Sequence, residues 1–172
     1  MCVMVRRTLE PVGEDVEQSV LRALDAIGLP YEAMPCDPEL ADTAAFCAHY
    51  GVAPEDSANT IVVVAKTDPR RYVACVVLAT TKLDVNGLVK RRLEARKVSF
   101  ASADETRELT GMMIGGVTVF ALPDDLPIWV DSRVLERESI VLGGGSRSLK
   151  IRVSPEVLRH LPGTNVVGDL AV

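Results

Sequence analysis

The residues best suited to chemistry lie in one apolar run, IGGVTVF, at residues 114–120. Gly115 and Gly116 interrupt this run, although a glycine there removes packing surface and adds backbone freedom. Bare backbone N–H groups can bind a carbonyl oxygen, a phosphate or a developing oxyanion. A bulge is the simpler interpretation from these residues alone, because glycine also marks irregular strands.

A second candidate for chemistry is a local basic run within an acidic chain. The net charge is −5, yet residues 82–97 carry six Lys and Arg against two Asp and Glu, with Lys90, Arg91 and Arg92 consecutive. Charge acts over only about 8 Å at physiological salt, so this run can meet a polyanion such as RNA despite the net acidity. A solvated helix face is the alternative.

The sequence lacks the patterns of metal, redox, serine-hydrolase and nucleotide-binding sites. The four cysteines and two histidines match no metal or redox spacing, and no GxSxG, P-loop or dinucleotide-binding pattern occurs. The sequence GGGSRS lies between two predicted strands, which favours a hairpin turn. No apolar run reaches the roughly 18 residues of a membrane span, and the start lacks a signal sequence. We therefore expect a cytoplasmic protein without metal or cofactor.

Hydrophobic periodicity predicts the elements that must position these residues. Helices are expected at residues 14–30, 37–52, 84–95 and 102–111, with a last one from Pro155. Residues 59–66 and 71–79 flank the turn signal TDPR and predict a hairpin. Further strands are expected in YEAMP, KVSFA, PIWVD, SIVL and LKIRV. These elements indicate one mixed α/β domain with a largely antiparallel sheet.

Several motifs in this order resemble the YbaK/EbsC family, relatives of the editing domain of bacterial prolyl-tRNA synthetase. They are NTIVVV, TKLDVNGLVKRRLEARKVSFAS, TGMMIGGVTVF, LPIWVD and VLGGGSRSLKIRV, and the resemblance covers roughly residues 14–160. It implies a single compact α/β domain over residues 1–172, built around a mixed, barrel-like sheet. It also implies trans-editing, the hydrolysis of a mischarged aminoacyl-tRNA. The implied partner is tRNA, with an aminoacyl-tRNA synthetase as a second partner.

The resemblance assigns the glycine run to the substrate pocket. The family loop reads GxxxP, and here it is Gly115, Gly116, Val117, Thr118 and Val119. Thr118 keeps the hydroxyl of the usual Ser, whereas Val119 replaces the Pro and is expected to leave the loop less rigid.

The resemblance also exposes a departure at the hairpin. The family's essential Lys aligns with Asn59, and the Thr that follows it aligns with Thr60. A shift of one residue would place Ala58 there, and Lys66 and Lys82 are the nearest lysines in sequence. Asn carries no charge near neutrality but both donates and accepts hydrogen bonds.

The remaining predicted roles follow from the same resemblance. Catalysis is assigned to Asn59, Thr60, Gly115 and Thr118, and substrate binding to Met34, Gly116, Val117, Val119, Asp131, Gly144, Gly145 and Lys150. Lys90, Arg91 and Arg92 are the predicted tRNA contacts. Asp131 fits a turn cap equally well. Three functions stay open: an editing hydrolase, a homologue that binds without turnover, and a regulatory partner without a nucleotide ligand.

Overall fold

The computed structural model describes residues 12–172, with side chains from residue 16 onward. The N-terminal segment and Cys2, on which part of the sequence analysis rests, lie outside the described residues. The α-helices are α1 (Val12–Ile27), α2 (Thr43–Tyr50), α3 (Lys90–Arg92) and α4 (Ala103–Thr110). The strands are β1 (Tyr31–Pro35), β2 (Ala58–Ala65), β3 (Arg71–Leu78), β4 (Val98–Phe100), β5 (Ile128–Asp131), β6 (Ile140–Gly143), β7 (Leu149–Val153) and β8 (Thr164–Val167).

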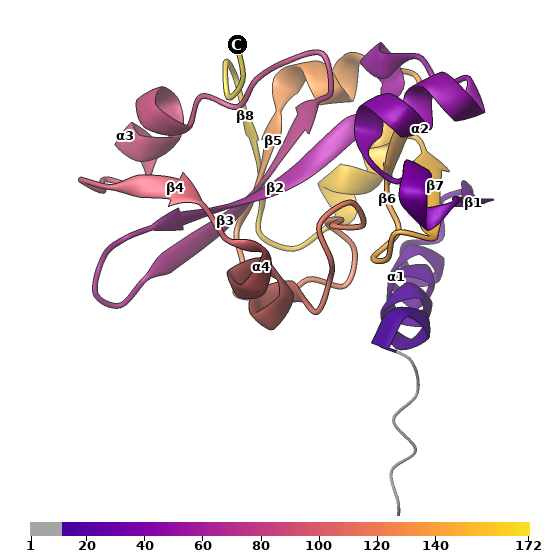
Figure 1. Ribbon diagram of the computed structural model, residues 1–172. Helices are drawn as coiled ribbons and strands as arrows, with labels where there is room; N and C mark the ends of the chain where they lie inside the picture. Colours follow the sequence, from indigo (N-terminus) through magenta and orange to yellow (C-terminus); the bar gives the residue numbers. More distant parts are fainter. Residues whose placement is uncertain (1–11) are drawn as a thin grey trace, which may run out of the picture.

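The strands form two open sheets that meet at one point (Figure 1). The smaller sheet has the order β1-β7-β6 and is antiparallel throughout. The larger has the order β4-β2-β3-β5-β8, in which β5 runs parallel to both β3 and β8. A single bridge between Ser57 and Val141 links the start of β2 to β6. The predicted mixed α/β fold is therefore confirmed, with the barrel-like sheet divided into two open sheets.

Both faces of the larger sheet are covered, which explains the nearly continuous apolar sequences of β2 and β3. Alternate residues of β3 face opposite cores: Ala74 and Val76 pack with Val20 and Leu24 of α1, on the side of the smaller sheet. Their neighbours on β3 pack on the other face with residues of the segment 83–95 and with the C-terminal residues Leu170 and Ala171. Figure 1 shows α1 beneath the smaller sheet and α3 at the far end of the larger one.

The predicted hairpin is confirmed, with every residue of β2 paired to β3. The capping box at the start of α4 is also confirmed, since Ser102 accepts a hydrogen bond from the Glu105 N–H and the Glu105 side chain accepts one from the Ser102 N–H. Gly111 ends this helix with φ 73°, a left-handed conformation that glycine adopts easily.

Three predicted helices differ in the structure. The helix expected at 37–52 is split into a 3₁₀ turn (Pro38–Leu40) and α2, because the Ala41 carbonyl accepts a hydrogen bond from Lys150 instead of extending a helix. The helix expected at 84–95 begins as a π-helical turn (Val85–Val89), in which the Asp84 carboxylate accepts hydrogen bonds from the N–H groups of Gly87 and Leu88. The last helix is a 3₁₀ helix (Pro155–His160).

The prediction of largely antiparallel pairing is confirmed for β1-β7, β7-β6, β4-β2 and β2-β3, whereas β5 pairs in parallel with β3 and β8. Strand β8 was not expected, because it has four residues and its central pair, Asn165 and Val166, is exposed. Such an edge strand leaves little apolar alternation to detect. Short 3₁₀ helices at Pro54–Asp56 and Ser132–Glu136 complete the described elements.

Candidate functional site

A cavity of about 390 Å³ opens where the two sheets meet. Its walls come from α2, β2, β6, β7, the end of β4, Thr106 of α4 and the segment 114–117. Five of the predicted site residues line it, from three separate segments: Asn59, Thr60, Gly115, Val117 and Lys150. The fold thus brings together residues that lie up to 91 positions apart in sequence.

The cavity lies at an unpaired stretch in the edge of β2. Strand β4 pairs with β2 only at Val63–Ala65, and the bridge to β6 lies at Ser57. The Val62 carbonyl accepts a hydrogen bond from the Ala101 N–H at 2.9 Å, so Val62 points its backbone groups away from β3. By the two-residue period of a strand, Thr60 presents its N–H and C=O at the same edge, where neither β4 nor β6 reaches. The Thr60 hydroxyl is also buried without a hydrogen-bond partner.

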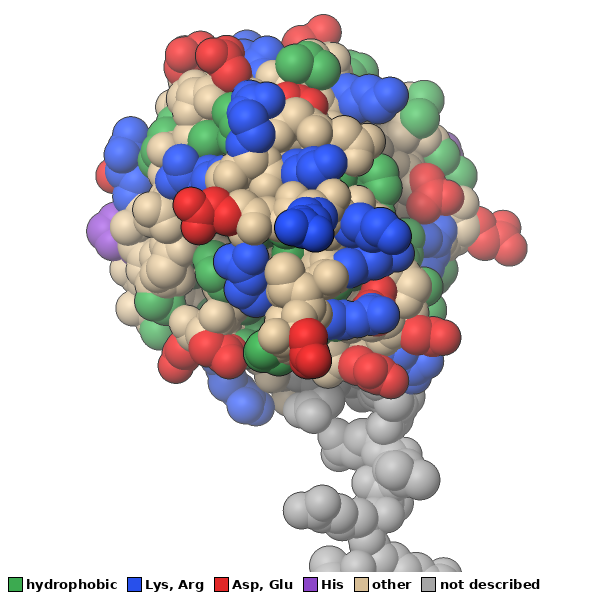
Figure 2. All heavy atoms as spheres, turned by 90° about the vertical axis from the view of Figure 1, so that its left-hand side faces the viewer, with side chains coloured by type: hydrophobic (Ala, Val, Ile, Leu, Met, Phe, Trp, Pro, Cys, Tyr) green, Lys and Arg blue, Asp and Glu red, His purple; other side chains and the backbone are tan. Residues whose placement is uncertain are grey.

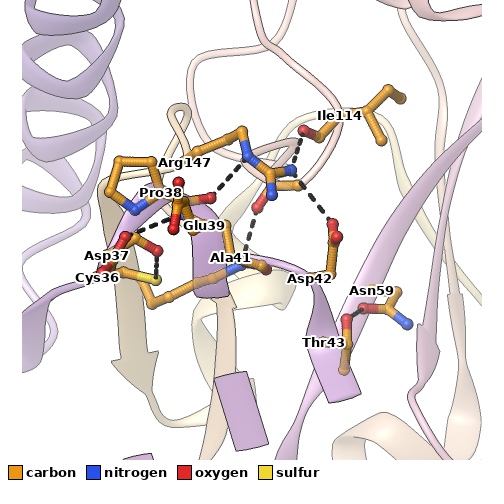
Figure 3. Close-up of polar contacts among 12 residues, drawn as sticks. Cys36, Asp37, Pro38, Glu39, Ala41, Asp42, Thr43, Asn59, Ile114 and Arg147 are labelled. Carbon is orange, nitrogen blue, oxygen red and sulfur yellow. Dashed lines mark hydrogen bonds and ion pairs between the residues drawn. The ribbon is translucent and has the colours of Figure 1, made fainter. Parts of the chain in front are cut away.

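Asn59 is held in place by α2. The Thr43 hydroxyl donates to the Asn59 amide oxygen at 2.8 Å (Figure 3). This contact leaves the amide nitrogen of Asn59, with its two N–H donors, unpaired among the described residues. Asn59 therefore offers hydrogen-bond donors to the cavity, without the charge of the family's lysine.

Lys150 supplies the positive charge of the cavity wall. Its side chain is only 7% exposed. The ammonium donates to the carbonyls of Ala41 and Gly115, each at 2.8 Å, and lies 5.4 Å from the centre of the Phe46 ring. Burial lowers the pKa of Lys150, because a charged amine loses hydration there. An ammonium has three donors, so one remains after the two carbonyl contacts.

The glycines of the segment 114–117 are explained by close backbone contact. A Cβ on Gly116 would lie 2.4 Å from the Ser146 backbone, and one on Gly143 would lie 2.4 Å from the Val117 carbonyl oxygen. The Gly145 N–H donates to the Gly116 carbonyl at 2.7 Å. The segment 114–117 is thus packed directly against the turn after β6, with no room for a Cβ atom at Gly116 or Gly143.

Two N–H groups in this segment remain available. The Gly116 N–H donates to the Met113 carbonyl, and the Thr118 N–H points to the sulfur of Met112. The N–H groups of Gly115 and Val117 have no partner within the described residues, and both residues line the cavity. They are the geometric candidates for binding an oxyanion.

Arg147 ties three segments together at the mouth of the cavity (Figure 3). Its guanidinium donates to the Pro38 carbonyl at 2.9 Å, to the Ile114 carbonyl at 3.0 Å and to the Asp42 carboxylate at 3.2 Å. Asp42 is the single carboxylate among the described lining residues, and its side chain is 72% exposed. The described wall of the cavity therefore holds many donors but no buried carboxylate and no histidine.

Several predicted site residues lie elsewhere. Thr118 is fully buried and its hydroxyl has no partner, while Val119 packs in the core and lines a second hollow of about 200 Å³ beside His160. Met34 pairs with Lys150 across β1 and β7 but is not among the lining residues. Gly116, Gly144 and Gly145 support the loop from outside the cavity.

Asp131 has a structural environment at the end of β5. It caps the following 3₁₀ helix, accepting hydrogen bonds from the N–H groups of Arg133 and Ala171 and an ion pair from the Arg133 side chain. Burial alone would raise the pKa of Asp131, but these hydrogen bonds outweigh it and hold the pKa below its ordinary value. All of its oxygens are thus satisfied within the chain, and Asp131 does not line the cavity.

The predicted tRNA contacts form the short helix α3, outside the cavity. Arg91 and Arg92 are exposed and Lys90 is half-buried, while the Arg92 guanidinium lies 5.1 Å from the centre of the Trp129 ring. Figure 2 faces this side of the molecule and shows Lys and Arg side chains gathered across it. The basic run is therefore a surface feature, as a binding face requires.

Sequence reasoning missed Thr43, Phe100, Ile114 and Arg147, which orient or border the cavity. Arg147 lies within GGGSRS, but its contacts reach residues more than 30 positions away. Phe100 had a signal, since it is one of only three phenylalanines. No cluster of three or more His, Cys, Asp or Glu in residues 12–172 could hold a metal ion. None of the helices described there is long and apolar enough to cross a membrane.

Comparison with known proteins gives one family and several related structures. The model of the aminoacyl-tRNA editing domain matches residues 37–161. A crystal structure of a hypothetical protein is 27% identical, with a TM-score of 0.78 over 90% of this chain and 99% of the other. The crystal structure of a proposed trans-editing enzyme for prolyl-tRNA synthetase is 23% identical, with a TM-score of 0.77 over 94% and 98%. A proposed signal transduction protein from Marinobacter aquaeolei is 19% identical, with a TM-score of 0.58 over 90% of this chain and 30% of that one.

Proposed function

The chain belongs to the aminoacyl-tRNA editing domain family, and on this premise we propose that it is a deacylase that acts in trans on mischarged tRNA. In the proposed reaction water attacks the carbonyl carbon of the ester between the amino acid and the terminal ribose. The C–O bond to the ribose then breaks, which releases the free amino acid and a tRNA with a free hydroxyl. The observation that carries the proposal is the convergence of unpaired donors on one cavity.

These donors suit an ester hydrolysis, because negative charge develops on the carbonyl oxygen in the transition state. The N–H groups of Gly115 and Val117, the Asn59 amide and the third donor of Lys150 can each stabilise that charge. The Lys150 ammonium also fixes the Gly115 carbonyl at 2.8 Å, which orients the loop that carries the N–H groups. Lys150 thus offers the cavity a positive charge where the family's lysine is replaced by Asn59.

No side chain of the cavity wall is a good general base. Asp42 is exposed and paired with Arg147, and no histidine lines the cavity. The ribose hydroxyl next to the ester is therefore the group that we assign to orient and polarise the attacking water. Such assistance from the substrate makes a protein base dispensable.

The size and lining of the cavity restrict the acyl group. Its volume of about 390 Å³ lies near the lower end for small-molecule sites. Phe46, Ile61, Val117, Val141 and Leu142 supply apolar walls. A small apolar or thiol side chain fits these walls.

A deacylation assay with a panel of mischarged tRNAs tests the proposal. We expect slow but measurable hydrolysis of at least one substrate by the wild-type protein. Asn59→Ala is expected to lower kcat about tenfold, because one donor that orients the carbonyl or the water is lost. The proposal fails if the folded wild-type protein releases no amino acid from any member of the panel.

A second candidate function is binding without turnover. The observation that favours it is the missing lysine at Asn59, together with a described cavity wall that lacks a buried carboxylate and a histidine. An aminoacyl-adenosine with an amide in place of the ester separates the two functions. The second function predicts tight binding of this analogue and no hydrolysis of the ester. A deacylase binds the analogue and also hydrolyses the ester.

A further inference from the structure

Phe100 is an exposed aromatic side chain at the mouth of the cavity. The chain has three phenylalanines, and the other two, Phe46 and Phe120, are at most 1% exposed. Phe100 is 55% exposed and ends strand β4, and Ile114, at 52%, lies on the wall of the same cavity. Full burial of one such side chain is worth about 1.5–3 kcal/mol, so the fold forgoes stabilisation here.

Single exposed apolar residues are common, but this pair has a specific position. Val166 and Val172 are 44% and 74% exposed and border no part of the cavity. Phe100 and Ile114 instead come from different segments and flank a cavity whose inner wall is rich in hydrogen-bond donors. A flat apolar surface beside polar groups suits a ligand with a planar ring and a polar continuation.

Positive charge begins at the other end of β4. Arg96 and Lys97 directly precede the strand, are exposed, and form no ion pair with any described residue. The Lys66 N–H donates to the Lys97 carbonyl at 2.9 Å, which brings a third exposed basic residue to the same place. Phe100 is three residues beyond Lys97, or about 10 Å at 3.3 Å per residue. Three stacked nucleotides of one strand cover about the same length, at 3.4 Å each.

We propose that β4 is the track for the single-stranded 3′ end of a tRNA. The terminal base stacks on Phe100 against Ile114, and the preceding phosphates contact Arg96, Lys97 and Lys66. Aromatic stacking next to a line of cations is the usual way in which proteins bind single strands. The identity of the strand rests on the proposed function, whereas the stacking and the charge contacts follow from the surface itself.

This track differs from the footprint predicted on α3. Helix α3 directly follows the π-helical turn Val85–Val89, and none of its residues borders the cavity. We assign α3 to the double-stranded part of the tRNA and β4 to its last three nucleotides. Reversing the charges of Lys90 and Arg91 is therefore expected to weaken the binding of whole tRNA and to leave the binding of a trinucleotide unchanged.

Binding of the free trinucleotide CCA to the full-length protein tests the track without any hydrolysis. We expect Phe100→Ala to weaken binding about 5- to 150-fold, the range for loss of one stacked base, and Phe100→Trp to retain it. Val166→Ala truncates another exposed apolar side chain, which lies away from the cavity, and is the control. A second probe, the same trinucleotide without its terminal base, is expected to bind wild type as weakly as CCA binds Phe100→Ala.

The charge contacts are tested by salt dependence. The double variant Arg96→Glu with Lys97→Glu is expected to bind CCA more weakly and with a flatter dependence on salt, because fewer counterions are released. Arg22→Glu reverses a charge on α1 and is the control. Equal binding of CCA to wild type and Phe100→Ala, or equal binding of intact and baseless trinucleotide, overturns the proposal. If the binding of CCA follows these expectations but no tRNA is deacylated, the proposed hydrolase function is refuted and the binding track on β4 is supported.

Discussion

Asp131 and Asn59 both lie at the end of a strand and are both predicted site residues, but their surroundings differ. The Asp131 carboxylate accepts hydrogen bonds from two backbone N–H groups and from the Arg133 guanidinium. Asn59 has one partner, Thr43, and the nearby Thr60 hydroxyl has none. A polar group that is fully paired within the chain stabilises the fold, whereas unpaired groups around a cavity are available to a ligand. Pairing therefore separates structural from functional candidates better than residue type does.

The largest expected effect is on stability, at Asp131. Asp131→Asn removes the charge of a buried carboxylate that accepts hydrogen bonds from two backbone N–H groups and from the partly exposed Arg133 side chain, and it is expected to lower the free energy of unfolding by about 3 kcal/mol. Activity of the folded fraction should stay unchanged, because Asp131 does not line the cavity. Denaturant titration and a deacylation assay measure the two quantities. If Asp131→Asn lost deacylation activity while its free energy of unfolding stayed unchanged, Asp131 would have a role in the functional site after all.

The same variant has a defined pH dependence. The folded-state pKa of Asp131 is lowered relative to about 3.9 in an unfolded chain, so its contribution is fully present above that value. The contribution is lost as the pH falls through the folded-state pKa. The difference in Tm between wild type and Asp131→Asn should therefore shrink below about pH 4, as thermal melts across pH 3–7 can show.

The next effect in size is on catalysis, at Lys150. Lys150→Met removes the cation and frees the carbonyls of Ala41 and Gly115, so we expect kcat to fall about 10²-fold, or about 2.7 kcal/mol. The double variant with Asn59→Lys returns a cation to β2 and should recover part of the rate. Lys82→Met removes an exposed lysine that does not line the cavity and should leave kcat unchanged. If folded Lys150→Met kept the kcat of wild type, the positive charge of Lys150 would have no role in the mechanism.

The smallest expected effect concerns two buried threonines and gives the most direct test of how pairing separates structural from functional residues. Thr60 and Thr118 each bury a hydroxyl without a partner, but only Thr60 lines the cavity. Replacing either by Val, which has the same shape, removes an unpaired polar group and should raise stability by about 1 kcal/mol. Only Thr60→Val should weaken substrate binding. Equal KM values for the two variants would contradict a role for Thr60.

The sequence predicted the hairpin, the cap of α4 and the family because these depend on local patterns. Residues 59–66 and 71–79 are apolar, rich in β-branched residues and flank a turn, and Ser102 and Glu105 are three positions apart. Asn59, Gly115 and Lys150 could be named together only through the resemblance, since no local pattern relates segments so far apart. Arg147 could not be predicted, because its importance comes from contacts across the fold, and the rarity of phenylalanine marked Phe100 without showing that it is exposed at the cavity.

The close contact between Gly116 and Ser146, and between Gly143 and Val117, affects how relatives of this chain should be sorted. These glycines are required by the space between two turns, whatever chemistry the cavity performs. A descendant that lost hydrolysis would keep them for as long as it kept its shape. Retained glycines are thus a marker of ancestry, whereas the residues at positions 59 and 150 carry the information about activity.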